Sequence, residues 1–287
     1  MRTLTFRGKL LAAARANDSL LCIGLDVVLA SLPASLPRSP ESIVAFNRGI
    51  VEATADLVCA YKPNLAFYEA LGLPGLEALT KTLEAIPEHI PVIADAKRGD
   101  VGHTARAYAR ALFETFGFDA ATVSPYLGRD ALQPFLDYAD RGVLVLCRTS
   151  NPGARDLQDL DVGGKPLYER VAEKVVEWDR HGNAGLVVGA TYPDEVARVR
   201  ALAPEMPLLV PGVGAQAGDV GAATRAAVDA RGELAIISSS RQVIYASGGA
   251  DFAEAARRAA LALRDEINQA RSRSLAPSTR PYGGADA

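Results

Sequence analysis

Eight short apolar runs alternate along this chain with longer segments of helical spacing, and this repetition restricts the possible folds to very few. The apolar runs are rich in Val, Ile and Leu, as is usual for strands covered on both faces. The longer segments are amphipathic, as in residues 41–51, where apolar side chains recur at spacings of three and four. Such alternation indicates βα units around a parallel sheet. The predicted strands are Leu20–Asp26, Leu57–Asn64, Pro91–Asp95, Ala121–Ser124, Gly142–Thr149, Gly185–Gly189, Leu208–Pro211 and Leu234–Ser238.

Eight βα units predict one α/β domain, a (β/α)8 or TIM barrel, formed by residues 1–271. The 287 residues would also suffice for two smaller domains, so length alone does not choose between these possibilities. A doubly wound open sheet is the other arrangement that the alternation allows. It is disfavoured because no Gly-x-Gly-x-x-Gly follows the first predicted strand, where a dinucleotide site would need it.

Two segments depart from the alternation. The segment from Asn151 to Lys165 follows the fifth predicted strand and is rich in Pro, Gly and Asp, so we expect an insertion and not a continuous helix. Its position suits either a mobile lid or an ordinary surface loop, and the sequence leaves both open. The tail from Ser272 to Ala287 is rich in Ser, Pro, Gly and Ala, and we expect it to be disordered.

Composition favours a small-molecule partner and a cytoplasmic location. The formal net charge of −3 gives no overall field that would hold nucleic acid or an anionic membrane. No stretch reaches the roughly 18 apolar residues of a membrane span, and no apolar signal segment follows Met1. Cys22, Cys59 and Cys147 lie far apart inside apolar stretches, which indicates reduced core thiols and not a disulfide framework or a zinc site.

The strongest functional signal is Asp95-Ala-Lys97-Arg98-Gly99-Asp100, which closes the apolar run 90–94. Because side chains alternate along a strand, Asp95 and Lys97 should point to the same face. Charged side chains are seldom buried without a partner, so an acid and a base on one face suggest a site. A lysine beside carboxylates should stay protonated, which favours a proton donor over a Schiff-base nucleophile.

Neighbouring strands end in charges as well. The first predicted strand closes with Gly24-Leu25-Asp26, and the second with Tyr61-Lys62-Pro63-Asn64. In a barrel the carboxyl ends of the strands meet, so Asp26 and Lys62 should lie near Asp95 and Lys97. Asp100 lies beyond its strand, where a turn through Gly99 could direct it away from its own site and toward a neighbouring subunit.

A second group of residues fits a phosphate site. The seventh predicted strand runs into Pro211-Gly-Val-Gly-Ala-Gln216, whose glycines let backbone amides approach an anion closely. The eighth strand leads to Arg241, which offers a forked cationic donor. The loops after strands seven and eight are the usual phosphate site of this fold, so the pairing predicts a phosphorylated ligand.

These motifs resemble orotidine 5'-phosphate decarboxylases. The segment Asp95-Ala-Lys97-Arg-Gly-Asp100-Val-Gly-His-Thr104 contains the Asp-x-Lys-x-x-Asp core that is the signature of that family, and Lys62 and the 211–216 loop also fit it. Residues 61–69, residues 125–130 and the insertion after the fifth strand are similar to the longer subgroup called type 2. The resemblance spans roughly Leu20 to Ser247, nearly the whole predicted barrel.

The resemblance implies a homodimer that converts orotidine 5'-monophosphate to uridine 5'-monophosphate, the last step of pyrimidine synthesis, with neither metal nor organic cofactor. It implies that Lys97 delivers a proton to pyrimidine C6, that Asp95 lies near the departing carboxylate and that Lys62 orients Asp95 and the ribose. Asp100 and Thr104 match positions that cross the dimer interface to the ribose in the other site. The remaining implied ligand contacts are Asp26 and Asn64 at the ribose and active site, Ser150 at the pyrimidine, Gln216 and Arg241 at the phosphate, and Pro211 in the same loop as Gln216.

Two other readings of the residues remain. Barrels such as 3-keto-hexulose-phosphate synthase and keto-gulonate-phosphate decarboxylase share Asp-x-Lys-x-x-Asp but use magnesium to stabilise an enediolate. The Tyr-Lys-Pro-Asn context of Lys62 favours the pyrimidine enzyme over these. A catalytically silent phosphate-binding barrel could keep Arg241, but it would not need two lysines and two aspartates. Whether Asp95 destabilises the bound carboxylate or mainly holds Lys97 stays open at this point.

Overall fold

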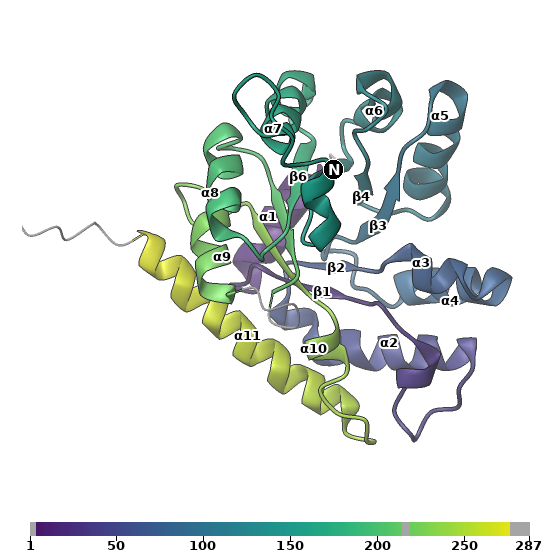
Figure 1. Ribbon diagram of the computed structural model, residues 1–287. Coiled ribbons are helices and arrows are strands. Elements are labelled where there is room, and N and C mark those ends of the chain that lie inside the picture. The colour runs from purple at the N-terminus through teal and green to yellow at the C-terminus, as the bar shows by residue number, and fades with distance from the viewer. Residues whose placement is uncertain (1–3, 214–218, 276–287) are drawn as a thin grey trace, which may run out of the picture.

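Eight parallel strands form one continuous sheet in the order β2-β1-β8-β7-β6-β5-β4-β3. The computed structural model describes residues 4–213 and 219–275 of the chain. The sheet curls round so that β2 and β3 meet through bridges at Tyr61 with Val92 and Asn64 with Asp95, which confirms the predicted (β/α)8 barrel (Figure 1). The strands are β1 Leu21–Gly24, β2 Ala60–Lys62, β3 Ile93–Arg98, β4 Ala120–Val123, β5 Gly142–Arg148, β6 Ala184–Val188, β7 Leu208–Pro211 and β8 Ala235–Ser239.

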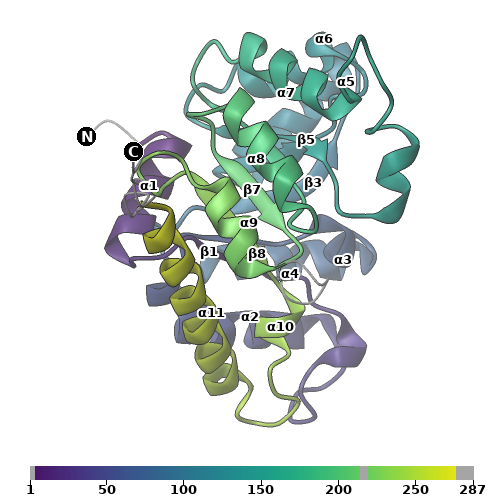
Figure 2. The same cartoon turned by 60° about the vertical axis from the view of Figure 1, so that its left-hand side comes forward.

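The helices surround this sheet, as Figures 1 and 2 show. The α-helices are α1 Phe6–Ala16, α2 Pro40–Thr54, α3 Leu65–Glu69, α4 Gly72–Glu84, α5 Gly102–Arg110, α6 Arg129–Leu136, α7 Leu167–Trp178, α8 Pro193–Leu202, α9 Val220–Ala227, α10 Arg241–Ile244 and α11 Phe252–Leu275. Short 3-10 turns form η1 Leu29–Ser31, η2 Ala55–Leu57 and η4 Pro152–Asp156, and η3 Ala111–Thr115 is a π-helical turn at the end of α5.

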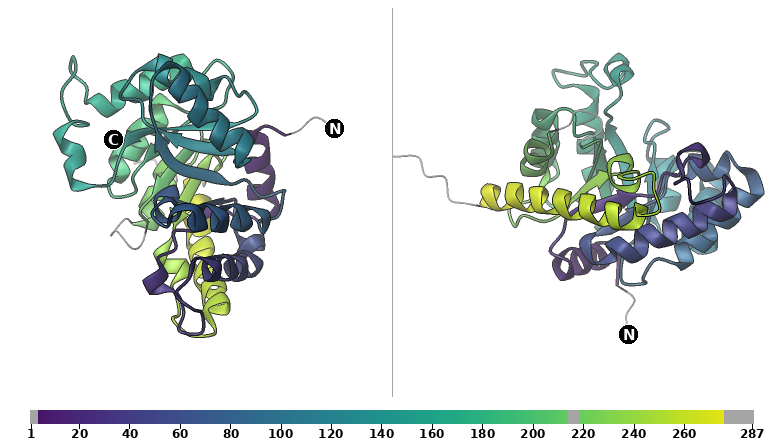
Figure 3. Two further views of the ribbon diagram at one scale, coloured as in Figure 1. Left: turned by 90° about the vertical axis from the view of Figure 1, so that its right-hand side faces the viewer. Right: turned by 90° about the horizontal axis from the view of Figure 1, so that it is seen from below.

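Burial explains the apolar runs. Almost every strand residue is buried, because side chains on one face fill the barrel and those on the other meet the helices. Helix α2, predicted from its spacing, buries Ile43, Phe46 and Ile50. It lies beside α11, which also packs along α9 (Figure 3). No helix within residues 4–213 and 219–275 has the length and apolarity to cross a membrane.

The strand bounds differ from the prediction where capping interrupts an apolar run. The predicted strand Leu57–Asn64 shrinks to Ala60–Lys62, because Leu57 ends η2 and Asn64 caps α3 by accepting from the backbone N–H of Ala66. The third strand starts later than predicted and continues through Arg98. Helix α1, which precedes the first strand and packs Phe6 close to Gly142, was not anticipated.

The two irregular segments also differ from a plain loop and a plain tail. The insertion forms η4 and a short antiparallel bridge between Asp161 and Pro166, and it stands out from the barrel in Figure 2. Helix α11 continues to Leu275, so the expected tail begins at least four residues too early at Ser272. The rest of the expected tail, residues 276–287, lies outside the described residues.

Candidate active site

A cavity of about 810 Å³ opens at the carboxyl ends of the strands. This is the end at which barrel enzymes place their catalytic groups. The cavity brings together residues from β2, β3, β5, β6, β7 and β8, and from the segment after β1, that are far apart in the sequence. The predicted site residues that line it are Asp26, Lys62, Asp95, Lys97, Ser150, Pro211 and Arg241.

Asp95 is the centre of the charged cluster. Its Oδ2 lies 2.9 Å from Lys62 Nζ, and its Oδ1 lies 2.6 Å from Lys97 Nζ. Lys62 is buried on β2, whereas Lys97 is about half exposed at the end of β3. The predicted juxtaposition of these three side chains is therefore confirmed.

The cluster fixes the charges of its buried members. Burial alone would lower the pKa of Lys62, but attraction to Asp26 and Asp95 outweighs it and raises that pKa. Burial alone would raise the pKa of Asp95, but the ammonium groups of Lys62 and Lys97 outweigh it and hold that pKa well below its usual range. Asp95 is thus a carboxylate and Lys62 an ammonium at neutral pH.

The backbone that carries Lys97 is not a regular strand. Lys97 has φ +48°, in the left-handed region, and the pairing of β3 with β4 shifts between Ala94 and Arg98. Thr122 on β4 lies opposite this bulge. Its hydroxyl accepts from Lys97 N at 3.0 Å and donates to Asp95 Oδ1 at 2.9 Å. Alternation along a strand gave the correct contact, although the local conformation is a bulge.

Asp26 is held in place from two sides. Its Oδ1 accepts from the backbone N–H of Asn64 at 3.0 Å, and its Oδ2 accepts from Ser240 Oγ at 2.7 Å. Gly24 leaves room for this arrangement, since a Cβ there would lie 1.9 Å from Ser240 Oγ. Asn64 itself does not line the cavity, so it acts here through its backbone and as the cap of α3.

The ends of β7 and β8 form the opposite wall. Gly212 has φ +92° and leads from Pro211 into Val213, a turn that favours glycine. Residues 238–240 and Arg241, at the start of α10, continue this wall. The predicted pairing of a glycine-containing turn with an arginine is present, whereas Gln216 lies outside the described residues.

The insertion contributes to the wall at β5. Gln158 lines the cavity next to Thr149 and Ser150, and its Oε1 accepts from the backbone N–H of Thr149 at 2.8 Å. Behind it, the fully buried Arg148 at the end of β5 holds the insertion to the barrel. Arg148 NH2 lies 3.4 Å from Asp159 in an ion pair. The insertion is therefore anchored beside the cavity by a buried charge.

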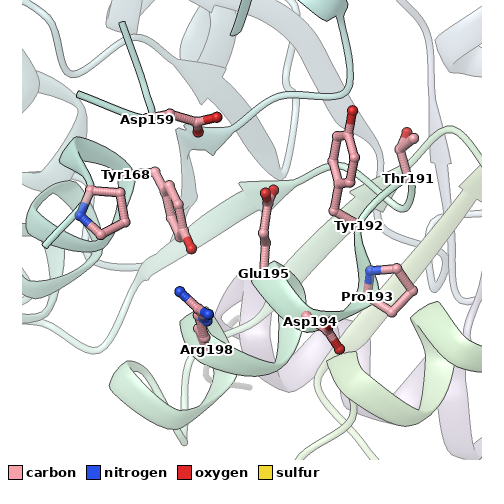
Figure 4. A pocket seen from close by; sticks show the side chains of 9 residues that line it. Asp159, Tyr168, Thr191, Tyr192, Pro193, Asp194, Glu195 and Arg198 are labelled. Carbon is pink, nitrogen blue, oxygen red and sulfur yellow. The ribbon is translucent and has the colours of Figure 1, made fainter. Parts of the chain in front are cut away.

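Asp159 also lines a second hollow of about 460 Å³, whose lining side chains are shown in Figure 4. Asp159, Tyr192 and Glu195 surround it, and Tyr192 and Glu195 come from the segment after β6. Arg148 Nε lies 2.8 Å from Glu195 Oε2 as an ion pair without the alignment of a good hydrogen bond. The Arg148 guanidinium also lies 5.3 Å from the centre of the Tyr192 ring. Two of the residues that line this hollow, Asp159 and Glu195, are thus the ion-pair partners of Arg148.

Asp100 and Thr104, like Asn64, do not line the cavity of their own chain. Asp100 Oδ1 accepts from the backbone N–H of Val101, and Thr104 lies in the first turn of α5. Val101, next to Asp100 in the sequence, is 53% exposed, and Tyr126 and Leu127, which follow the neighbouring strand β4, are 82% and 47% exposed. Exposed apolar side chains thus follow both β3 and β4.

The residues around the site that were not among the predicted ones include Thr122, Gln158 and Ser240. Ser240 follows the eighth strand and Thr122 lies near the end of the fourth, so the strand-end reasoning that found Lys62 could have included them. Gln158 carries no such signal, because its place depends on how the insertion folds back.

This fold and cavity define a (β/α)8-barrel enzyme whose cavity gathers two lysines, two aspartates and an arginine at the carboxyl ends of the strands. The sequence matches the family described as "Orotidine 5'-phosphate decarboxylase / HUMPS family" over residues 19–259. The chain belongs to this family.

Individual relatives agree with this assignment. The chain is 55% identical to orotidine 5'-phosphate decarboxylase of Thermomicrobium roseum, over 93% of this chain and 96% of that one. It is 58% identical to the protein of the same name from Herpetosiphon aurantiacus, over 90% and 96% of the two chains. Its fold matches the structure of Leishmania donovani OMP decarboxylase with a TM-score of 0.83 and 43% identity, over 94% of this chain and 100% of that one.

Proposed function

We propose that this protein decarboxylates orotidine 5'-monophosphate to uridine 5'-monophosphate and carbon dioxide, with Lys97 as the proton donor to pyrimidine C6. The protein is an enzyme of pyrimidine biosynthesis, and this reaction is the last step of de novo UMP formation. The observation that carries the proposal is the contact of Lys62 and Lys97 with the two oxygens of Asp95, inside a cavity that Arg241 also lines.

The charged cluster suits the chemistry of this reaction. Loss of carbon dioxide leaves negative charge on a ring carbon that delocalises it poorly, and a fixed ammonium stabilises such charge as it develops. Lys62 is buried and held by two carboxylates, so it suits a structural role. Lys97 is 48% exposed, contacts one carboxylate and faces the cavity, which favours it as the group that delivers the proton.

A proton donor alone does not account for decarboxylation. The largest enzymatic accelerations correspond to about 23 kcal/mol of barrier reduction or more, whereas general acid catalysis contributes roughly 10²–10⁴-fold. Binding energy from the phosphate must therefore assist the reacting centre. We assign this binding to Arg241 with Pro211 and Gln216, the ribose to Asp26 and Asn64, and the pyrimidine to Ser150. Supporting this, Asp26, Ser150, Pro211 and Arg241 line one cavity.

We further propose a homodimer in which Asp100 and Thr104 serve the partner subunit's site. Both residues lie outside the cavity of their own chain, and Val101, Tyr126 and Leu127, which follow the neighbouring strands β3 and β4, expose apolar side chains that suit a subunit contact. The proposal includes a cytoplasmic location, which the buried free thiols of all three cysteines support. It requires no metal and no organic cofactor.

Replacement of Lys97 by Ala tests the proton donor. We expect UMP formation to fall below detection while the circular dichroism spectrum and UMP binding persist, because Lys97 is half exposed and its removal leaves no buried cavity. Lys174→Ala, at another exposed lysine, which pairs with Glu177 on α7, is the control and should keep full activity. Appreciable turnover by the Lys97 variant would sink the assigned role.

Mixing of two inactive variants tests the shared site. Asp100→Ala and Lys97→Ala homodimers should each be inactive. Subunit exchange should then restore part of the activity, because one of the two sites in a mixed dimer carries neither substitution. An absence of recovery, with exchange demonstrated by native mass spectrometry, would contradict the contribution of Asp100 across the interface.

Loss of the orotate absorbance separates this function from its alternatives. A magnesium-dependent enediolate enzyme of the same family description would leave that absorbance unchanged and would lose its own activity on chelation. A catalytically silent barrel would bind UMP without turnover.

A further inference from the structure

The position of Lys97 depends on an unusual backbone conformation. Its φ of +48° places it in the left-handed region, which is sterically unfavourable for an L-residue and rare for a lysine. Such a conformation persists only where surrounding contacts over-determine it. The contacts that hold the Lys97 backbone therefore also determine where its ammonium group can reach.

The usual contacts of a strand are missing at this point. Ala94 pairs with Ala121 and Arg98 pairs with Val123, so three residues of β3 lie opposite the single residue Thr122 of β4. The bulge is fixed at its far end, where the backbone N–H of Ser124 donates to Arg98 O at 2.8 Å. Between these two fixed points, the Lys97 N–H bonds to the Thr122 side chain in place of a ladder partner.

The hydroxyl oxygen of Thr122 takes part in two hydrogen bonds, which link the backbone of Lys97 to the side chain of Asp95. Its Oγ1 accepts from Lys97 N at 3.0 Å and donates to Asp95 Oδ1 at 2.9 Å. The same Oδ1 is the atom that Lys97 Nζ contacts at 2.6 Å. Because Thr122 is only 1% exposed, water does not compete for its hydroxyl.

From this geometry we propose that Thr122 is a positioning residue for the decarboxylation. It holds the bulge that directs Lys97 toward the cavity, and it turns Asp95 so that Oδ1 faces Lys97 while Oδ2 faces Lys62. The proposal rests on the proton-donor role proposed for Lys97. Thr122 does not line the cavity. It therefore acts through its two neighbours, Asp95 and Lys97.

Two substitutions separate the hydroxyl from the volume of the side chain. Thr122→Val keeps the shape and removes both hydrogen bonds, whereas Thr122→Ser keeps the hydroxyl. A misplacement of about 1 Å at a reacting group can lower the rate on the order of 10²-fold. We therefore expect Thr122→Val to lower kcat on the order of 10²-fold, with KM and the Kd of UMP within about threefold of wild type. The kcat of Thr122→Ser should stay within about tenfold of wild type. The two variants should differ because the retained hydroxyl keeps Lys97 in position, and the rate is sensitive to that position.

The control matches the burial and bonding of Thr122. Thr54 is also buried, and its hydroxyl also makes two bonds, to Tyr61 OH and Ile50 O, on the helical side of the barrel. Thr54→Val should lose stability comparably but keep kcat. If Thr122→Val does not fold, Thr122→Ala takes its place, with the same criteria applied.

The outcomes distinguish a positioning role of Thr122 from a purely structural role. A wild-type kcat in folded Thr122→Val, or a kcat in Thr122→Ser as low as in Thr122→Val, would overturn the positioning role. So would a kcat of Thr122→Val that falls only in proportion to the folded fraction of that variant. Full activity of Lys97→Ala would instead refute the donor role itself, so the two failures are distinguishable.

Discussion

Replacement of Asp95 by Asn tests whether burial or distance decides the strength of the two ion pairs in the cluster. Lys97 Nζ is closer to Asp95, at 2.6 Å, than Lys62 Nζ, at 2.9 Å. The Lys97 side chain, however, is 48% exposed and that of Lys62 only 5%. Coulomb energy varies inversely with distance and with permittivity, and the effective permittivity differs about fourfold between water and a partly buried site. Burial should therefore outweigh the small difference in distance.

The expected magnitudes follow from this difference. Breaking a buried pair typically costs about 3–5 kcal/mol, and an exposed pair contributes about 0.2–1 kcal/mol. Asp26 also attracts Lys62 and would remain after the substitution, so the lower end applies to the buried pair. We expect a coupling free energy of about 3 kcal/mol between Asp95 and Lys62 and less than about 1 kcal/mol between Asp95 and Lys97.

Double-mutant cycles measure both couplings. The variants are Asp95→Asn, Lys62→Met, Lys97→Met and the two double variants that include Asp95→Asn. Urea unfolding without ligand, at one fixed protein concentration, gives the free energy of unfolding of each. A Lys97 coupling equal to or larger than the Lys62 coupling would refute the argument from burial.

The same variant has a defined pH dependence. The folded-state pKa of Asp95 is lowered, so the stability it provides is fully present above about pH 4, the ordinary carboxyl range, and is lost as pH falls through the folded pKa. The folded-state pKa of Lys62 is raised, so its contribution is present below about pH 10 and is lost as pH rises through the folded pKa. The stability difference between wild type and Asp95→Asn should therefore shrink below about pH 4.

Three other perturbations follow from the geometry of the cavity. Arg241→Ala should lower kcat as well as raise KM for orotidine 5'-monophosphate, whereas a change in KM alone would mean that phosphate binding does not assist the chemical step. Gly24→Ala should cost about 1–3 kcal/mol and raise KM, because the new methyl group would lie 1.9 Å from Ser240 Oγ and 3.1 Å from Asp26 Oδ2; thermal unfolding with an unchanged midpoint would contradict this. Activity should survive EDTA, since no group of three His, Cys, Asp or Glu in the described part of the chain could hold a metal ion; a loss that magnesium reverses would overturn this expectation.

The barrel, and the part of its site that lies at the strand ends, could be predicted because they follow from local rules. Apolar runs between amphipathic segments fix eight βα units, and the strand ends of such units must meet. Asp26, Lys62, Asp95 and Lys97 were found in this way, and they share one cavity. The left-handed conformation of Lys97 could not be predicted, because it depends on a hydroxyl from the neighbouring strand.

Arg148 shows why the insertion was harder to predict than the strands. An arginine inside an apolar run suggests an exposed end, yet Arg148 is 1% exposed because Asp159 and Glu195 neutralise it from two different segments. A buried charge without a partner would be strongly unfavourable. The ion pair between Arg148 and Asp159 therefore orders a segment whose composition is typical of a loop. Any movement that separated Asp159 from Arg148 would remove one of these partners. The ion pair of Asp159 therefore fixes the middle of the insertion to the barrel, and the hydrogen bond from the backbone N–H of Thr149 keeps Gln158 at the wall of the cavity.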